Sequence, residues 1–551
     1  MLRLKSIKLY FFATLKLLFL SFRNYYLKTN FYNKKLEREI PSRIFYSPSS
    51  YLISSLTTNS NDYYKITNFS PEIIWQTNIE NKSEFNNLHS FLWLTKIDRK
   101  NSKILTKDII ISWINKFFNY DTKTWDAEIT SKRIIAWTSN TDITLQDSEK
   151  YYKEKFFLSL TKQINFLVRN LKTLPNNSSK IICCSAIILS GIIFSENNSN
   201  QKFGIKELEK IIKIYFDKNG FPKSRSPEEL FVSLKYLILI REWFKEAHIS
   251  IPEFLNDIIY RSGICYSMLS SLSKQFPLFN GSTEIEHKDY DTFLKDHKYK
   301  FVCKEKEISE FIKVSKKKFD LFMDCGNPPQ DKFSNHYQAG CLSFELISKT
   351  QKIICNTGYG KHLSPKLTLL SRSTAAHSTL YINDTSSCIF QKNRIINKVY
   401  GNSLVEKHKI INKNYTENNE FYFLSASHNG YEKKFGYVHT RSIRIFKKKD
   451  EILGCDELKK TRNRLNSVNF SIRFHIYPNT KIVKTKSNKS VLISLENGEG
   501  WLLESKTNNI NIENDIFLGN RNQIMKSESV LIAGTTNESL SSIDWKIERI
   551  D

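Results

Sequence analysis

The feature that most constrains the fold of this chain is a change in the spacing of its apolar residues. Between residues 105 and 244, apolar side chains recur every three or four positions, the pattern of a helix with one buried face. Beyond residue 315 they recur every second position, the pattern of a strand in a half-buried sheet. The sequence therefore predicts a helical domain followed by an antiparallel β-sandwich.

The helical half contains several segments with one apolar face. Residues 181–194 are apolar on all sides but too few to span a membrane, so they predict a helix buried among other helices. Residues 226–229 read Ser-Pro-Glu-Glu, a capping box that predicts the start of another helix. We expect Thr106 to be the N-cap of an earlier helix. The apolar stripes of two earlier helices are Ile109, Ile110, Trp113, Ile114 and Phe117, and Phe156, Leu160, Ile164, Leu167 and Leu171.

The second half contains alternating runs separated by turn signals. Asn497 and Gly498 form a two-residue hairpin signal, because both residue types tolerate a positive φ. Residues 447–451 and 484–489 are charged or polar and predict turns between strands. The alternating runs are Leu342, Phe344 and Leu346; Phe470, Ile472, Phe474 and Ile476; and Val491, Ile493 and Leu495.

The composition narrows the partners without choosing one. The 83 Lys and Arg residues exceed the 56 Asp and Glu residues by 27, which favours nucleic acid, an anionic membrane or an acidic glycan. The richness in Lys, Ile and Asn that an AT-rich genome imposes explains the same excess equally well. The basic residues are dispersed and accompany no nucleic-acid motif, so we expect no nucleic-acid partner. The nine cysteines lack a CxxC spacing and predict free, buried thiols.

The first 30 residues form a basic and apolar segment. Arg3, Lys5 and Lys8 precede an apolar run from Leu9 to Phe22. This run is interrupted by a lysine, lacks an A-x-A cleavage site, and is too short and too charged to predict a membrane span. Two interpretations stay open: an imperfect export signal, and an uncleaved interfacial helix that makes peripheral contact with a membrane.

Several motifs resemble those of the heparinase II/III-like family, and their order and spacing fit that family. Segments 427–431, 439–441 and 473–475, and in the helical half 88–91, 224–227 and 278–281, look similar to an alphaproteobacterial branch of it. The resemblance runs from residue 85 to the C-terminus. The motifs shared with the whole family are residues 324–329 (Asp-Cys-Gly-Asn-Pro-Pro), 339–345 (Ala-Gly-Cys-Leu-Ser-Phe-Glu), 356–358 (Asn-Thr-Gly) and 374–380 (Thr-Ala-Ala-His-Ser-Thr-Leu).

The resemblance implies an incomplete α/α toroid followed by an antiparallel β-sandwich, with an acidic polysaccharide bound between the two. We accordingly expect a basic apolar segment over residues 1–30, a toroid-like domain over 31–310 and a sandwich over 311–551. The resemblance also implies β-elimination at a uronic acid. That reaction needs a donor that neutralises the sugar carboxylate, a base for the C5 proton and an acid for the departing oxygen.

The structural zinc site of some family members is altered in this chain. The family pattern has His-x-His, Asp-x-Gly and Ala-His, whereas here residues 336–338 are His-Tyr-Gln, 356–358 are Asn-Thr-Gly and 376–377 are Ala-His. His336 falls at the position of the family's catalytic histidine. Gln338 and Asn356 replace two ligands with neutral amides, which bind zinc poorly, so we expect no bound metal and no cofactor.

The family's functional residues in the helical half are also replaced. Its Asn-His pair aligns near Ser178 and Ser179, and its tyrosine aligns with Glu229. Either this branch uses other residues or it has lost lyase activity. Each candidate has a structural alternative: a hydrogen-bonded histidine, a packed tyrosine, or an arginine paired with a neighbouring acid. Our candidates for catalysis are His336, Tyr431, His377 and His439, and those for substrate binding are Arg225, His428, Arg441 and Asn177.

Two functions fit these observations. The leading prediction is a lyase that cleaves an acidic, uronate-containing polysaccharide by β-elimination. The alternative is a non-catalytic glycan-binding or polysaccharide-assembly protein that keeps the fold with an altered site. We expect the protein in the cell envelope or periplasm, with the cytoplasm as the alternative. The glycan, the linkage and the oligomeric state stay open.

Overall fold

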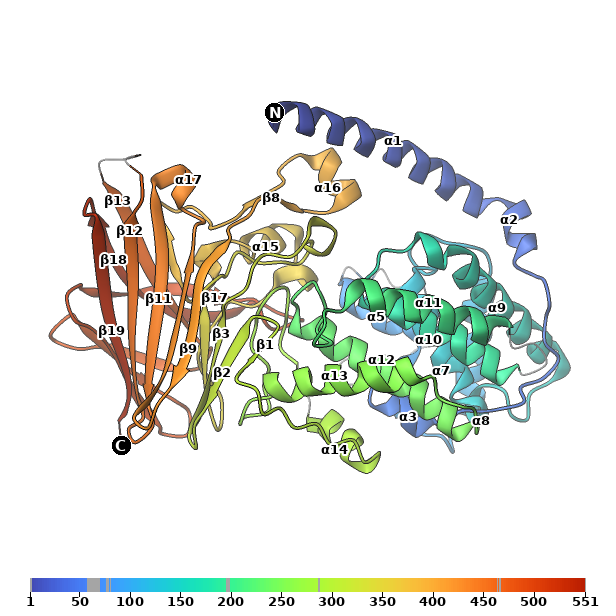
Figure 1. Cartoon of the computed structure of the whole chain (residues 1–551). Coiled ribbons are helices and arrows are strands. Elements are labelled where there is room, and N and C mark those ends of the chain that lie inside the picture. Colours follow the sequence, from blue (N-terminus) through green and yellow to red (C-terminus); the bar gives the residue numbers. More distant parts are fainter. Residues whose placement is uncertain are drawn as a thin grey trace. The chain divides into compact units, whose positions relative to one another are not determined.

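The computed structural model describes residues 2–56, 70–75, 79, 81–194, 199–285, 288–462, 464 and 467–550. The chain forms two compact units, one of residues 1–220, 229–263 and 286–300, the other of residues 221–228, 264–285 and 301–551. The predicted domain boundary at residue 310 differs from this division, because two segments that precede it pack with the β-structure. Helices occupy the first part of the chain and strands the second, which confirms the predicted fold class (Figure 1).

The first unit is built from helices. In α10, every residue from Lys180 to Ile193 is buried, and the helix packs against α7, α9 and α11. This confirms the buried helix predicted over residues 181–194. The helices up to residue 300 are α1 (Leu2–Lys28), α2 (Asn30–Lys35), α3 (Ser50–Ser54), α4 (Pro71–Ile74), α5 (Lys82–Ser90), α6 (Lys103–Phe117), α7 (Ala127–Thr138), α8 (Thr141–Thr144), α9 (Lys150–Asn170), α10 (Ser178–Ile193), α11 (Ser199–Tyr215), α12 (Pro227–Glu246), α13 (Glu253–Leu269) and α14 (Lys288–Asp296).

Two predicted helix starts can be compared with the structure. The helix α12 begins at Pro227, where the capping box predicts it. The prediction for Thr106 is wrong, because α6 begins at Lys103 with Ser102 as its N-cap and Thr106 is fully buried inside the helix. Residues 103–105, Lys-Ile-Leu, favour or tolerate helix and extend α6 toward its N-terminus.

The second unit is an antiparallel β-sandwich. One sheet has nine strands in the order β1-β2-β3-β4-β5-β13-β18-β17, with β6 also paired to β13, and the other has eight in the order β14-β15-β16-β19-β12-β11-β10-β9. The strands β7 and β8 form a separate pair. Three short helices, α15 (Pro365–Leu370), α16 (Arg394–Tyr400) and α17 (Glu432–Phe435), connect strands.

The strand bounds follow the alternating pattern of the sequence. They are β1 (Glu307–Ile308), β2 (Phe311–Ser315), β3 (Phe319–Asp324), β4 (Phe344–Ser348), β5 (Lys352–Cys355), β6 (Leu380–Ile382), β7 (Ile389–Phe390), β8 (Leu404–Glu406), β9 (Ile410–Glu417), β10 (Phe421–His428), β11 (Tyr437–Phe446), β12 (Glu451–Lys460), β13 (Val468–Ile476), β14 (Lys481–Lys484), β15 (Ser490–Ser494), β16 (Gly500–Ser505), β17 (Ile510–Phe517), β18 (Met525–Thr536) and β19 (Leu540–Ile550).

The apolar core of the sandwich lies between the two sheets, whose inward side chains join one buried cluster. Phe344 of β4 stacks on Trp545 of β19 with ring centroids 5.5 Å apart, and Phe474 of β13 meets the same indole edge-on at 5.2 Å. Burial of such surface contributes about 25 cal/mol per Å² and is the main force that joins the sheets.

Most strand predictions are confirmed, and one is wrong. The hairpin between β15 and β16 turns at Gly498, whose φ is +84°. Leu342 lies outside the predicted strand: its φ is +61°, and β4 begins only at Phe344. A left-handed residue cannot continue a strand, because its carbonyl and amide no longer point toward a neighbouring strand.

The remaining expectations concern the cysteines and the membrane. All nine cysteines are free thiols, and seven of them are buried, as predicted. Within the described residues, we find no helix that combines the length and the apolar character needed to cross a membrane.

Candidate functional site

His336 is exposed, whereas the other three predicted catalytic residues are buried. Its Nδ1 lies 3.0 Å from the hydroxyl of Tyr359, and the two rings meet edge-on. The backbone of His336 packs against Gly281, where an added Cβ would lie 2.7 Å from the Cβ of His336. Because Gly281 also has a φ of +84°, only glycine suits this position, and it fixes the place of His336.

A buried carboxylate, Glu228, holds two cations in the same unit. Its Oε1 accepts a hydrogen bond of 2.8 Å from Nζ of Lys361 and one of 3.2 Å from Nη2 of Arg521. Its Oε2 accepts from the amide and the hydroxyl of Thr283 at 3.0 and 2.9 Å. Glu228 therefore uses both oxygens to hold Lys361 and Arg521 in place.

Lys361 and Arg521 are partly exposed, so a ligand can reach both. Although burial alone raises the pKa of Glu228, Lys361 and Arg521 hold it well below its usual range. The carboxylate therefore stays ionised. The side chains of Lys361 and Arg521 are 26% and 40% exposed, and a Lys ammonium and an Arg guanidinium carry more donors than Glu228 occupies. They are suited to bind an incoming carboxylate.

Tyr359 connects this cation pair with His336. Its hydroxyl faces Nδ1 of His336, and Nζ of Lys361 lies 6.0 Å from the centroid of its ring. The side chain is 2% exposed and is therefore held in one place. We name His336, Tyr359, Lys361 and Arg521, with Glu228 beneath them, the His336 cluster.

The residues at the family's metal position do not fit a metal ion. Gln338 accepts from the amide of Gly281 at 2.8 Å and donates to the carbonyls of Gly358 and Ser371 at 3.1 and 2.6 Å. Asn356 is likewise bonded to the carbonyl of Leu278 and the amide of Ser378. The two amides thus cross-link the loops that a metal would otherwise join. Among the described residues, no group of three or more His, Cys, Asp or Glu is placed to hold a metal.

His377 lies beside this cross-link but is 1% exposed. Its Nδ1 donates to the carbonyl of Ser373 at 2.8 Å, and no hydrogen bond reaches its buried Nε2. Burial lowers the pKa of His377 to about 4, so the ring is neutral at pH 7. Its predicted catalytic role stays a prediction, without a path from solvent to the imidazole.

His428, a predicted substrate-binding residue, and His439, a predicted catalytic residue, both lie buried inside the sandwich. The amide of Gly430 donates to Nδ1 of His428 at 3.0 Å, so Nε2 carries the proton of the neutral ring and faces Nδ1 of His439 at 3.2 Å. His439 in turn donates from Nε2 to Asp456 at 2.7 Å. Burial, more than any neighbouring charge, lowers the pKa of both histidines.

Arg441 completes this buried network. Its guanidinium binds both oxygens of Asp456, from Nε at 2.8 Å and Nη2 at 2.9 Å, and donates from Nη1 to the carbonyls of Leu342 and Ser378. Those carbonyls precede strands β4 and β6 of the other sheet, so Arg441 joins the two sheets. We name His428, His439, Arg441 and Asp456 the buried network.

The other candidates also have structural partners. Tyr431 is fully buried and donates to the carbonyl of Leu380 at 3.0 Å, the packed tyrosine of the structural alternative. Arg225 is 6% exposed and pairs with Asp324 at 2.7 Å, which is the neighbouring acid of its structural alternative. Asn177 is the N-cap of α10 and accepts from the amide of Lys180. None of these contacts supports a role in substrate binding or catalysis, which stays a prediction for each residue.

The sequence reasoning missed four members of the His336 cluster. Tyr359 follows directly on the Asn-Thr-Gly motif, and Lys361 lies two residues later, so this motif was the available signal. Glu228 was seen only as part of a capping box. Arg521 lies outside every motif, and only the tertiary structure brings it to Glu228.

Comparison with known proteins assigns the second unit to a family. Residues 307–546 match the family model "Heparinase II/III-like, C-terminal". A curated relative, FtsZ-localized protein C from Caulobacter vibrioides, is 22% identical over 243 residues, which cover 42% of this chain and 41% of that protein. The match therefore spans less than half of the relative.

Solved structures share the fold over most of both chains. The crystal structure of heparinase III has a TM-score of 0.69 at 13% identity, covering 91% of this chain and 84% of that one. The heparan sulfate lyase HepC mutant from Pedobacter heparinus has a TM-score of 0.62 at 14% identity, covering 94% and 83%. The fold is thus the α/α toroid and β-sandwich of these lyases. Residues 307–546 thus form a heparinase II/III-like C-terminal domain.

Proposed function

We propose that this protein binds an acidic, uronate-containing polysaccharide and cleaves it by β-elimination at the His336 cluster. The observation that carries the proposal is the exposure of His336 together with its hydrogen bond to Tyr359. Tyr359 in turn lies beside the ammonium of Lys361. One fixed side chain, Tyr359, thus connects a base with a cation. A base and a cation are two of the three groups that the reaction needs.

The roles follow from the positions of the atoms. Lys361 and Arg521 bind the sugar carboxylate and so stabilise the negative charge that develops when the C5 proton leaves. Tyr359 is a positioning residue that orients the imidazole through Nδ1. His336 takes the C5 proton at Nε2, the C5–H electron pair forms the C4=C5 double bond, and the bond from C4 to the glycosidic oxygen breaks. The imidazolium then returns the proton to that oxygen.

The test is to incubate the full chain with heparan-like, alginate-like and self-produced glycans and to follow the ultraviolet absorbance of the unsaturated uronate. We expect His336→Ala to lower the rate at least about 100-fold, as for loss of a general base. Tyr359→Phe should shift the pH profile, and Lys361→Met should both raise KM and lower kcat, because the ammonium binds the substrate carboxylate and stabilises the charge that develops on it. No absorbance with any acidic glycan would contradict the proposal. Unchanged turnover in Tyr431→Phe and His439→Gln would remove those buried residues from the mechanism.

The second candidate function is non-catalytic glycan binding or polysaccharide assembly. The replacement of the metal ligands by Gln338 and Asn356, whose side chains are hydrogen-bonded to backbone groups, favours it. So does the absence of the family's Asn and Tyr from their expected positions in the sequence. Glycan binding that produces no new chain ends would support this candidate over the lyase.

The N-terminal helix supports a further part of the proposal, a peripheral contact with an anionic membrane. Residues 1–28 contain six basic and no acidic residues. Large apolar side chains along α1 are exposed, including Phe11 at 58%, Phe19 at 64% and Phe22 at 75%. Exposed aromatic and basic residues on one helix are typical of an interfacial helix. The proposed location is the cell envelope, and equal sedimentation with anionic and neutral vesicles would contradict the membrane contact.

A further inference from the structure

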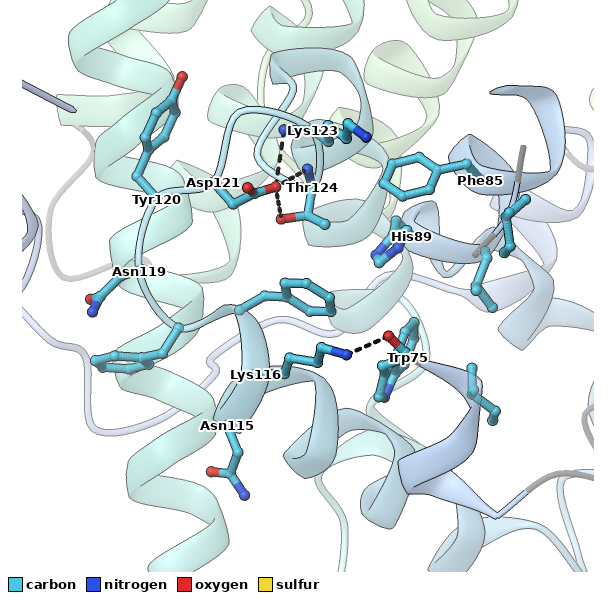
Figure 2. Close-up of a pocket in the computed structure, with 15 residues that line it drawn as sticks. Trp75, Phe85, His89, Asn115, Lys116, Asn119, Tyr120, Asp121, Lys123 and Thr124 are labelled. Atoms are coloured by element: carbon cyan, nitrogen blue, oxygen red, sulfur yellow. Dashed lines mark hydrogen bonds between the residues drawn. The ribbon is translucent and has the colours of Figure 1, made fainter. Parts of the chain in front are cut away.

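The helical unit contains a cavity of about 540 Å³ that no residue of the His336 cluster or of the buried network lines. It is formed by the end of α4, by α5, and by the end of α6 with the loop that leads to α7. Figure 2 shows the ring of His89 near the middle of this cavity. Cavities of this size are typical of small-molecule sites.

One side of the cavity is aromatic. Phe85, Trp75 and Phe117 surround the ring of His89 with centroids at 4.3, 5.3 and 5.3 Å. All three rings also line the cavity. Flat, apolar surfaces of this kind pack against the C–H faces of a sugar ring, which are apolar as well.

His89 adds one hydrogen-bond donor to the aromatic side of the cavity. Its Nδ1 accepts from the indole N–H of Trp113 at 3.1 Å, so Nε2 carries the proton of the neutral ring. Burial and the nearby Arg133 lower the pKa of His89 to about 3. His89 is 4% exposed, and its Nε2 makes none of the described hydrogen bonds. Among the described residues, no group accepts a hydrogen bond from this N–H.

The opposite side of the cavity is polar. Asp121 uses Oδ1 to accept from the amides of Lys123 and Thr124, at 3.0 and 2.9 Å, and from the Thr124 hydroxyl at 3.1 Å (Figure 2). Burial opposes ionisation, but these amides hold the pKa of Asp121 below its usual value. Its Oδ2 makes none of the described hydrogen bonds and stays available as an acceptor.

Two lysines, Lys116 and Lys123, also line the cavity. The ammonium of Lys116 donates to the carbonyl of Trp75 at 2.6 Å, as Figure 2 shows. The ionised carboxylate of Asp121 and the neutral imidazole N–H of His89 are two further polar groups of the lining. Such a pair suits hydroxyl groups, which both donate and accept, and the charge of Asp121 disfavours a carboxylate placed against it.

We infer that this cavity binds an uncharged sugar unit, a hexose or an N-acetylhexosamine. The aromatic rings contact its C–H face, His89 donates to one hydroxyl, and Asp121 accepts from another. This inference concerns binding alone and does not depend on lyase chemistry at His336. It adds to the proposed function a second glycan contact that recognises a neutral unit, whereas the cations Lys361 and Arg521 recognise a charged one.

The experiment is saturation-transfer NMR on the full chain with D-glucose, N-acetyl-D-glucosamine and D-glucuronate as separate probes. We expect transfer to at least one uncharged sugar, and we expect the part of the signal that depends on Phe85 to be smaller for glucuronate, which Lys361 and Arg521 also bind in the proposed function. Phe85→Ala should reduce the signal at least threefold, because it removes one aromatic wall. Asp121→Asn keeps an oxygen for the loop amides and replaces Oδ2 with an NH₂ donor, so it should shift the preference toward glucuronate.

Tyr260→Ala is the matched control, because Tyr260 is an aromatic residue of the same unit that is 62% exposed and does not line the cavity. It should leave the transfer to the uncharged sugars unchanged, and so should His336→Ala, which separates this inference from the lyase proposal. Equal melting temperatures of the variants show that folding is retained. No transfer to either uncharged sugar, wild-type transfer of the uncharged sugars in Phe85→Ala, or a larger loss for glucuronate than for the uncharged sugars in that variant would overturn the inference.

Discussion

The His336 cluster and the buried network contain the same kinds of side chain in opposite surroundings. Both combine histidine with an acid and a cation, and both belong to the β-sandwich unit. His336 is exposed, and Lys361 and Arg521 keep part of their surface in solvent. In the buried network, His439, Arg441 and Asp456 are all 0% exposed.

The difference shows what each group can do. In the buried network, the partners already satisfy Asp456, His439 and Arg441, so the charges stabilise one arrangement of two sheets and offer nothing to a ligand. In the His336 cluster, one buried carboxylate holds two cations that keep unused donors. The same chemistry is therefore structural in one place and available for binding in the other.

The largest expected effect on stability is in the buried network. Arg441→Met leaves the charge of Asp456 buried without its bidentate partner, so we expect a loss of about 3–5 kcal/mol in the free energy of unfolding. Urea denaturation followed by circular dichroism measures it. The control is Arg462→Met, because Arg462 is 56% exposed and lies 3.7 Å from Glu432. Its loss should be under about 1 kcal/mol. Equal losses in the two variants would mean that burial of the network adds nothing to the free energy of unfolding.

The second effect is a loss of stability in mild acid. Burial lowers the pKa of His377 and of His408 to about 4, from 6.5 in the unfolded chain. Between these pH values the unfolded chain binds more protons than the folded one. The free energy of unfolding is therefore highest above pH 6.5 and decreases as the pH falls toward 4. Each such histidine lowers it by up to about 1.4 kcal/mol per pH unit.

The measurement is the urea midpoint from pH 7.5 to pH 4.5. His408→Phe and His377→Phe, as separate variants, should each reduce the slope even if they lower stability at pH 7. A wild-type midpoint that stays constant from pH 7 to pH 5 would contradict neutral, buried histidines.

The smallest expected effect on stability is at the His336 cluster. His336→Ala removes one exposed ring, so the free energy of unfolding should change by no more than about 0.5 kcal/mol. The same variant should lose most of its lyase activity. Thermal denaturation of His336→Ala and of Arg441→Met directly compares how much the two regions contribute to stability. A large destabilisation by His336→Ala would mean that this cluster is structural as well.

Much of the fold could be predicted because its signals are local. The buried helix α10, the start of α12 and the hairpin at Gly498 each depend on residues that are close in sequence. The motif that contains Asn356 could have indicated Tyr359 and Lys361, which follow it directly. Arg521 could not be predicted from any local pattern, because 293 residues separate it from Glu228.

The sequence by itself determined the two halves, the identity of most of their elements and the loss of two metal ligands, because spacing and residue type are properties of neighbouring residues. Only the tertiary structure decided which histidines face solvent. The exposure of a histidine depends on contacts between residues far apart in the chain. One such contact joins Arg441 to the carbonyl of Leu342, which lies 99 residues earlier and precedes a strand of the opposite sheet. A motif names a side chain, whereas its surroundings set its charge, its exposure and its use.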